Sequence, residues 1–145
     1  MSHAKSLLTG FSIAVAAALL AGCASTPAAQ GGSADRASYM AHAGPPVDHL
    51  AFHTTYKRLA AISADQLVVW TNLQQPYLVT VRHPCANLWF ARHIGVTQTG
   101  DNVYAGTNLV KADGWSCAIK AIQPVDYRQM QQDKLRQHEA NASGS

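Results

Sequence analysis

Charged residues are scarce in this sequence. They make up 13% of its 145 residues, whereas about 25% is usual in a soluble domain. Lys and Arg number 11 against 8 Asp and Glu, which gives a formal net charge of +3. The basic residues are also scattered along the chain, whereas a nucleic-acid-binding surface gathers Lys and Arg on one face. We therefore expect no nucleic-acid partner.

Motifs of catalysis and redox chemistry are lacking as well. The sequence has no Gly-x-Ser-x-Gly segment, which α/β-hydrolases use to expose a serine, and no Cys-x-x-Cys pair. The acidic residues are dispersed, and Asp101 and Asp113 fall in predicted turns, where aspartate bonds to the local backbone. We expect a protein that is not an enzyme and uses no cofactor. An envelope hydrolase, the alternative, would need a pocket of converging polar groups.

The sequence has no apolar run of the length that a membrane-spanning helix needs, about 20 residues. Its longest run, Leu7 to Ala21, follows Lys5 and leads into Leu20-Ala21-Gly22-Cys23. A positive charge, a short apolar stretch and small residues before the cut are typical of a secretory signal peptide. The last four residues resemble the lipobox of bacterial lipoproteins. We predict a signal peptide over residues 1–22 and lipid attachment to Cys23. The alternative is an ordinary signal peptide with a chance cysteine at the cut.

A lipid on Cys23 predicts a location and a first partner, the membrane itself. Two or more acyl chains anchor a protein stably, because each buried methylene contributes about 0.8 kcal/mol. Residue 24 is Ala. In enterobacterial lipoproteins an Asp at that place retains the protein at the inner membrane. The resemblance therefore implies the cell envelope, at the outer membrane and facing the periplasm. An envelope protein or a small ligand is the further expected partner.

Cysteine is rare, with three residues in all: Cys23, Cys85 and Cys117. Once Cys23 is lipidated, the other two remain as a pair in an oxidising compartment, where disulfides form. We predict a structural Cys85–Cys117 bridge, which closes a loop of about 33 residues and contributes roughly 3.5–4 kcal/mol in the chain-entropy model. A redox-active pair or a metal site is the alternative, although redox cysteines are usually separated by only two other residues, as Cys-x-x-Cys.

The composition divides the chain into further parts. Residues 23–46 are rich in Ala, Gly, Ser and Pro and have almost no large apolar side chain. Because such a segment cannot bury a core, we predict a disordered, flexible tether. Residues 47–128 are expected to form the folded domain. Residues 129–145 are expected to form a polar tail, either as coil or as a frayed helix.

Within the domain, β-branched and aromatic residues recur between turn formers, which is typical of short strands. The segments expected to be strands are Tyr56–Ile62, Gln66–Thr71, Tyr77–Arg82, Ile94–Gln98, Val103–Lys111 and Ser116–Ile122. A short helical segment is expected within Cys85–Arg92. The sequence predicts an all-β fold, namely a small antiparallel barrel or roll of five to six strands.

Several details of these strands can be tested. Gly106 is a candidate β-bulge inside the fifth strand. The Asp113-Gly114 pair is typical of a hairpin turn. Alternation predicts that Cys117, Ile119 and Ala121 of the last strand share one face.

Histidine is the one abundant reactive residue type. His49 and His53 lie four residues apart and would share the face of a helix, and His42 lies seven before His49. Together they are candidate ligands for zinc or copper. The alternative is that these are exposed polar residues, because the Gly44-Pro45-Pro46 segment is unfavourable to a rigid helix and a metal site needs fixed ligands.

The three tryptophans are candidates for either core or contact residues. Trp70 lies in a β-branched run and is predicted to be buried. Trp89 and Trp115 lie near the two cysteines of the predicted bridge. If they are exposed, they are candidate contact residues for a glycan, a peptide or a lipid; if they are buried, they belong to the core.

Several short segments between Val68 and Asp126 resemble segments that occur in the same order in a known family. They are Val69-Trp70-Thr71, Tyr77-Leu78-Val79, Cys85-Ala86-Asn87-Leu88, Phe90-Ala91, Ile94-Gly95-Val96-Thr97, Cys117-Ala118-Ile119 and Pro124-Val125-Asp126. Through them the chain resembles a family of small proteobacterial lipoproteins whose shared domain has no assigned function. The resemblance implies the anchor, the disulfide and the fold, and no activity. The family pattern has an acidic residue near Asn108, where this chain has an amide.

Taken together, the sequence predicts a lipid-anchored cell-envelope protein with a non-enzymatic accessory or binding domain. The alternative is a periplasmic metal- or haem-binding lipoprotein that uses His42, His49 and His53.

Overall fold

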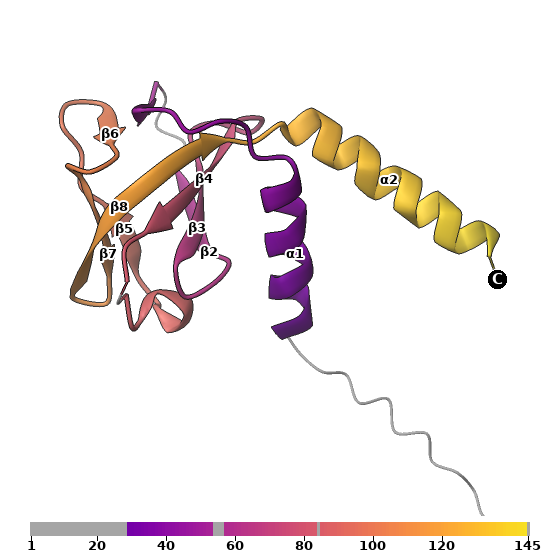
Figure 1. The fold of residues 1–145 in the computed structure, drawn as a ribbon, viewed down its shortest axis with the longest axis horizontal. Helices are drawn as coiled ribbons and strands as arrows, with labels where there is room; N and C mark the ends of the chain where they lie inside the picture. The colour runs from indigo at the N-terminus through magenta and orange to yellow at the C-terminus, as the bar shows by residue number, and fades with distance from the viewer. Residues whose placement is uncertain (1–28, 54–56, 84, 145) are drawn as a thin grey trace, which may run out of the picture.

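The computed structural model describes residues 29–53, 57–83 and 85–144 (Figure 1). The predicted signal peptide and Cys23 lie outside these residues. The helices are α1 (Ala29–Ala41), the 3-10 helix η1 (Leu88–Phe90) and α2 (Tyr127–Ser143). The strands are β1 (His49–Ala51), β2 (Arg58–Ala61), β3 (Gln66–Trp70), β4 (Pro76–Val81), β5 (Ile94–Val96), β6 (Asn102–Tyr104), β7 (Leu109–Ala112) and β8 (Trp115–Pro124).

Six strands form one antiparallel sheet in the order β2-β3-β4-β8-β7-β5. The two edge strands, β2 and β5, contact each other, so that the sheet nearly closes into a barrel. β1 and β6 form a separate two-stranded antiparallel pair. The predicted all-β barrel of five to six strands and its short helical segment, η1, are therefore confirmed.

The interior of the barrel is an apolar core. Alternate residues of each strand point inward, as the period of two requires. Leu67 and Val69 of β3 and Val79 and Val81 of β4 are fully buried there. The other buried members are Leu50, Phe52, Cys85, Leu88, Val103, Val110, Ala112, Cys117, Ile119 and Ile122.

A second, smaller core lies on the outer face of the sheet. It contains the residues of β3 and β4 that point away from the barrel, Val68, Trp70 and Leu78, together with Ile62, Val125 and Met130. The rings of Trp70 and Tyr127 pack edge to face with centroids 4.7 Å apart. Both faces of β3 are thus covered, which explains its unbroken Leu-Val-Val-Trp run. The predicted burial of Trp70 is confirmed.

Residues 29–46 of the expected tether have a defined structure, and the prediction of a flexible segment up to residue 46 is corrected. Residues 29–41 form α1, which lies along the outside of the barrel (Figure 1). Tyr39 packs against the outer core, and the Arg36 Nε donates to the Gln66 Oε1 at 2.7 Å. The segment is rich in alanine, which is typical of a tether but is also the residue type with the highest helix propensity. The packing of Tyr39 and the hydrogen bond of Arg36 both hold the helix against the sheet.

The expected fifth strand is divided in two. Gly106, at a φ of +78°, lies in a turn between β6 and β7. The Asn108 side chain closes this turn, because its Oδ1 accepts the Tyr104 backbone N–H at 2.7 Å. Gly106 is therefore a turn residue and not a bulge within a continuous strand.

A bulge does occur in β8, where the sequence predicted regular alternation. Val81 pairs with Ile119, but Thr80 pairs with Ala121, so Lys120 is the extra residue. One extra residue exchanges the two faces of the strand beyond it. Ile122 is consequently buried in the barrel, and Ala121, which was predicted to face inward, is not part of that core.

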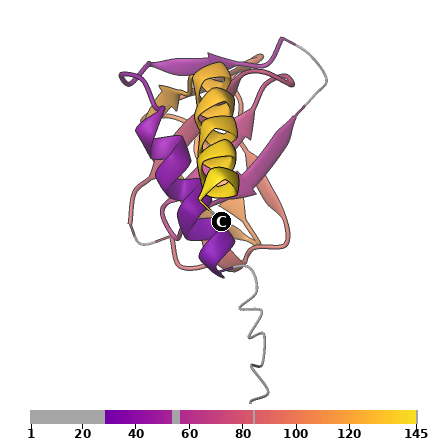
Figure 2. The same cartoon turned by 90° about the vertical axis from the view of Figure 1, so that its right-hand side faces the viewer.

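The polar tail is mostly helix α2. Asp126 caps it, because its Oδ1 accepts the Gln129 backbone N–H at 3.0 Å. Met130 is the buried residue of this helix. From there α2 projects away from the barrel, as Figures 1 and 2 show from two directions. None of the helices in the described part of the chain is long and apolar enough to span a membrane.

Candidate functional site

The predicted disulfide is present between Cys85 and Cys117. Both cysteines are buried in the barrel core. The bridge joins the segment before η1 to strand β8 and so holds the 3-10 helix against the barrel.

The three candidate metal ligands lie in different surroundings. His42, at the end of α1, contacts the Ser38 carbonyl oxygen and the Asp133 carboxylate. His49 is in β1, with its ring 5.2 Å from that of Tyr104. His53 is exposed in the loop after β1. Over residues 29–53, 57–83 and 85–144, no three His, Cys, Asp or Glu side chains are grouped as metal ligands. Metal binding stays a prediction to which this arrangement adds no support.

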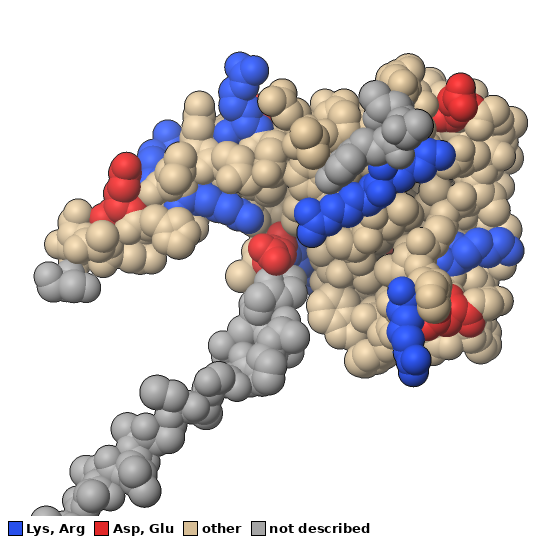
Figure 3. Space-filling view, turned by 180° about the vertical axis from the view of Figure 1, so that it is seen from behind, with Lys and Arg blue, Asp and Glu red and all other residues tan. Residues whose placement is uncertain are grey.

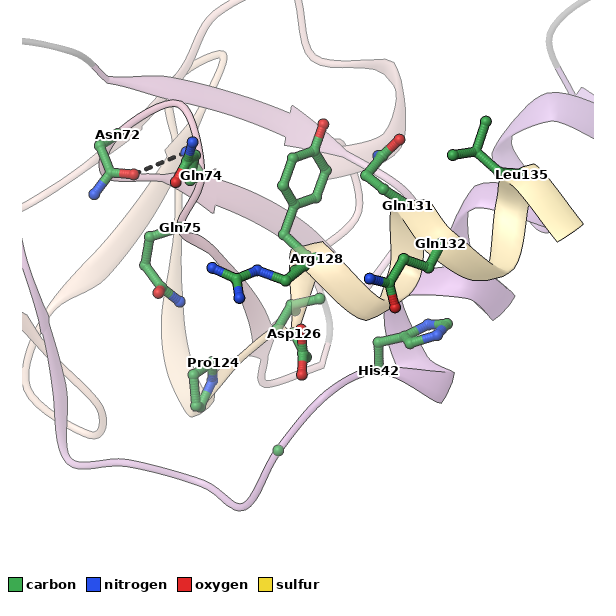
Figure 4. A pocket seen from close by; sticks show the side chains of 13 residues that line it. His42, Asn72, Gln74, Gln75, Pro124, Asp126, Arg128, Gln131, Gln132 and Leu135 are labelled. Atoms are coloured by element: carbon green, nitrogen blue, oxygen red, sulfur yellow. Dashed lines mark hydrogen bonds between the residues drawn. The ribbon is translucent and has the colours of Figure 1, made fainter.

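A groove of about 980 Å³ lies beside the start of α2 (Figure 4), and a larger hollow of about 1190 Å³ lies between α1 and α2. One wall is the loop between β3 and β4, and the other is the outer face of the first turns of α2. The end of β8 forms the floor. Amide side chains dominate the lining: Asn72, Gln74, Gln75, Gln131 and Gln132.

Local hydrogen bonds fix both walls. In the β3–β4 loop, the Gln75 carbonyl oxygen accepts from the Thr71 backbone N–H at 3.2 Å, and the Asn72 Oδ1 accepts the Gln74 N–H at 2.8 Å. The Val125 N–H donates to the Pro76 carbonyl oxygen at 3.0 Å and so joins the two walls. The groove is therefore built on anchored backbone.

One guanidinium group lies within this groove. Figure 4 shows the Arg128 side chain extending between Gln75 and Asp126, toward the middle of the hollow. Arg128 is exposed and forms no ion pair or side-chain hydrogen bond with another described residue. Amides that both donate and accept, together with one planar cation, suit a polar ligand that presents an acceptor or a carboxylate.

The shifted pKa values in the protein have structural causes. A hydrogen bond to Asp133 and a second one to the Ser38 carbonyl raise the pKa of His42. The His42 ring, followed by Arg136, lowers the pKa of Asp133. Two backbone N–H groups, of Arg92 and His93, lower the pKa of Asp113.

The same holds for Asp65, whose pKa is lowered chiefly by the Ser63 hydroxyl. The His42–Asp133 contact and the two bonds to Asp113 join separate segments, and the Ser63–Asp65 bond closes a turn. Structural networks of this kind perturb pKa values as active sites do.

Trp89 and Trp115, for which the sequence allowed either burial or exposure, differ in exposure. Trp115 is 54% exposed at the start of β8, so it remains a candidate contact residue. Trp89 is half-buried in η1 and lines a hollow of about 500 Å³ with residues 59–61. Phe90, which the sequence did not single out, is 79% exposed.

The groove itself was not foreseen. Its lining comes from a polar loop, from the end of the expected domain and from a tail that was expected to be coil or a frayed helix. Asp126 before a polar run is a helix-start signal that could have indicated α2. The sequence of α2 has no periodic apolar pattern that would predict where the helix packs, because the helix has a single buried residue, Met130.

Comparison with known proteins finds a match to one family. The family model described as "Family of unknown function (DUF6491)" matches residues 5–141. No curated protein and no solved structure matches the chain.

Proposed function

Because the chain belongs to the DUF6491 family, whose function is unknown, we propose its function from its own residues. It is a lipid-anchored protein of the cell envelope that binds another envelope protein through the groove, without catalysing a reaction. The observation that carries the proposal is the Arg128 guanidinium, which has no ion-pair or hydrogen-bond partner among the described residues and lies among five amide side chains on a rigid frame.

The anchor in this proposal is Cys23. Its support is the Leu20-Ala21-Gly22-Cys23 segment that follows a short apolar run. The mature protein would then lie at the periplasmic face of the outer membrane.

The groove favours a protein partner over a purely apolar ligand. A peptide backbone offers N–H donors and carbonyl acceptors, which the side chains of Gln74, Gln131 and Gln132 can pair on either side. Leu135, 63% exposed at the end of the groove, adds an apolar contact. The face seen in Figure 3 is largely uncharged, with a few Lys, Arg, Asp and Glu side chains distributed over it.

The non-catalytic part of the proposal is supported by the hydrogen bonds of His42 and Asp126, two residues that line the groove. His42, the histidine that borders the groove, has both ring nitrogens engaged. Asp126 is engaged as the helix cap. A general base needs a free nitrogen or oxygen that faces the substrate.

The anchor is tested by the mass of the mature protein purified from membranes. We expect an N-terminal Cys23 with acyl chains, and loss from the membrane fraction in Cys23→Ala. A mature chain without lipid would overturn this part.

The groove is tested by photo-crosslinking in living cells. A photoreactive residue at position 131 should give a specific product that is lost when Arg128→Ala is added. The matched control is the same residue at position 120, since Lys120 is exposed on β8 and does not line the groove. The same products from both positions would refute the groove as the binding site.

A further inference from the structure

Two large apolar side chains are exposed at one end of the barrel. Phe90 in η1 is 79% exposed and Trp115 at the start of β8 is 54% exposed. We call this end, from residues 86–93 and 111–116, the aromatic end. Exposed aromatic residues of this size occur where a protein meets a partner or a membrane.

The aromatic end is held rigidly. The Asp113 carboxylate accepts the backbone N–H groups of Arg92 and His93, each at 2.9 Å. Phe90 lies two residues before Arg92, and Trp115 lies two residues after Asp113, so the two rings flank one linkage. The Cys85–Cys117 bridge holds the same region from inside the barrel. Rings on such a frame lose little conformational freedom on contact.

The aromatic end is also the end at which the chain enters the fold. In Figures 1 and 2 the start of α1 lies at the same lower end of the molecule as η1 and the β7–β8 turn. Ala29 is six positions after Cys23. Even a fully extended segment of that length spans only about 20 Å. A lipid on Cys23 therefore keeps this end of the domain close to the bilayer.

The charges at the aromatic end fit a lipid surface. Arg92 and Lys111 are exposed there, and the Asp113 carboxylate is engaged by backbone N–H groups. Basic side chains beside aromatic rings are the composition that binds at the headgroup level of an anionic membrane. Tryptophan in particular is enriched in that layer.

We propose that the aromatic end rests on the bilayer that carries the Cys23 lipid, with Trp115 and Phe90 in the headgroup layer. This inference rests on the proposed lipid anchor. β8 runs from Trp115 at this end to Pro124 at the groove. The contact would therefore fix the orientation of the domain and hold the groove away from the membrane.

The test uses the full-length lipidated protein in vesicles of phosphatidylcholine and phosphatidylglycerol. Phosphatidylcholine brominated on its acyl chains quenches tryptophan fluorescence only at short range. We expect clear quenching of the wild type and loss of most of it in Trp115→Phe. Phe90→Ala should reduce the quenching in part. Trp70→Phe is the matched control and should leave it unchanged, because Trp70 is buried in the outer core.

The outcomes separate this inference from the anchor. A lipidated, vesicle-bound protein whose Trp115 is quenched equally by aqueous iodide with and without vesicles would overturn the membrane contact and leave the anchor standing. A mature chain without lipid on Cys23 would overturn both. Trp89 belongs to the same aromatic end, so quenching that survives in the double variant Trp89→Phe/Trp115→Phe would contradict the proposed surface.

Discussion

The His42 ring and the Asp133 carboxylate join the two helices, with Nε2 2.7 Å from Oδ2. The other ring nitrogen, Nδ1, lies 2.8 Å from the Ser38 carbonyl oxygen. The carbonyl and the carboxylate are both acceptors, so both contacts are hydrogen bonds when the ring is an imidazolium with hydrogen on each nitrogen. This arrangement explains why the pKa of His42 is raised and that of Asp133 is lowered.

This pair predicts how stability depends on pH. The raised pKa of His42 contributes stability that is fully present below the ordinary histidine value of about 6.5 and is lost as pH rises through the raised value. The lowered pKa of Asp133 contributes stability that is lost only as pH falls through that lowered value. We expect the thermal unfolding midpoint of the wild type to fall as pH rises from about 6 to about 9.

The control is His42→Gln, which is neutral at every pH. Its midpoint should lie below that of the wild type in mild acid and should change less over the same range. Equal slopes for the two proteins would contradict the imidazolium bridge.

The docking of α2 predicts a contrast between two residues of the same helix. Met130 is fully buried in the outer core, whereas Leu135 is 63% exposed. Met130→Ala should lower the free energy of unfolding by about 2–5 kcal/mol, because it removes buried side-chain volume. Leu135→Ala should change it by less than about 0.5 kcal/mol. Urea unfolding measures both values, and equal effects would mean that α2 does not pack as described.

Much of the barrel was accessible from the sequence because its strands are short and clearly bounded. Gln66–Trp70 and Pro76–Val81 were foreseen almost to the residue, since turn formers flank β-branched runs. The disulfide followed from counting cysteines. The strands depend on local composition, and the disulfide depends on the pairing of the two remaining cysteines in an oxidising compartment.

The rest depends on contacts between distant segments. The β8 bulge at Lys120 is set by pairing with β4 and leaves no local trace in the sequence. The order of α1 depends on Tyr39 meeting an outer core that β3 supplies. The groove exists only because α2 leaves the barrel beside the β3–β4 loop. Local patterns could not indicate any of these three.

Removal of the disulfide should be costly because of the loop that it closes. Cys85 and Cys117 are 32 residues apart, and in the chain-entropy model a loop of that length contributes about 3.5–4 kcal/mol. The double variant Cys85→Ala/Cys117→Ala should lose roughly that amount in urea unfolding. Reductant should lower the stability of the wild type and leave the double variant unchanged. If reductant added to the unfolded wild type does not change its measured stability, the result would argue against the bridge.

The last prediction concerns Asn108, which is 5% exposed. Its Oδ1 accepts the Tyr104 N–H at 2.7 Å, and its Nδ2 donates to the hydroxyl oxygens of Thr97 and Thr99 at 3.3 and 3.4 Å. Asn108→Ala leaves the Tyr104 N–H without this partner inside the turn. We expect a loss of about 1–3 kcal/mol in urea unfolding.

Asn108→Asp separates two roles for this position, because the resembling family has an acidic residue near it. A carboxylate can still accept the Tyr104 N–H, and the hydroxyl hydrogens of Thr97 and Thr99 can rotate to donate to it. The Asp variant should therefore retain more stability than the Ala variant at neutral pH and lose that advantage as its carboxylate is protonated in acid. If Asn108→Asp is as unstable as Asn108→Ala at neutral pH, this turn requires an amide. The acid of the family would then belong to a different local structure, and its role would not transfer to this chain.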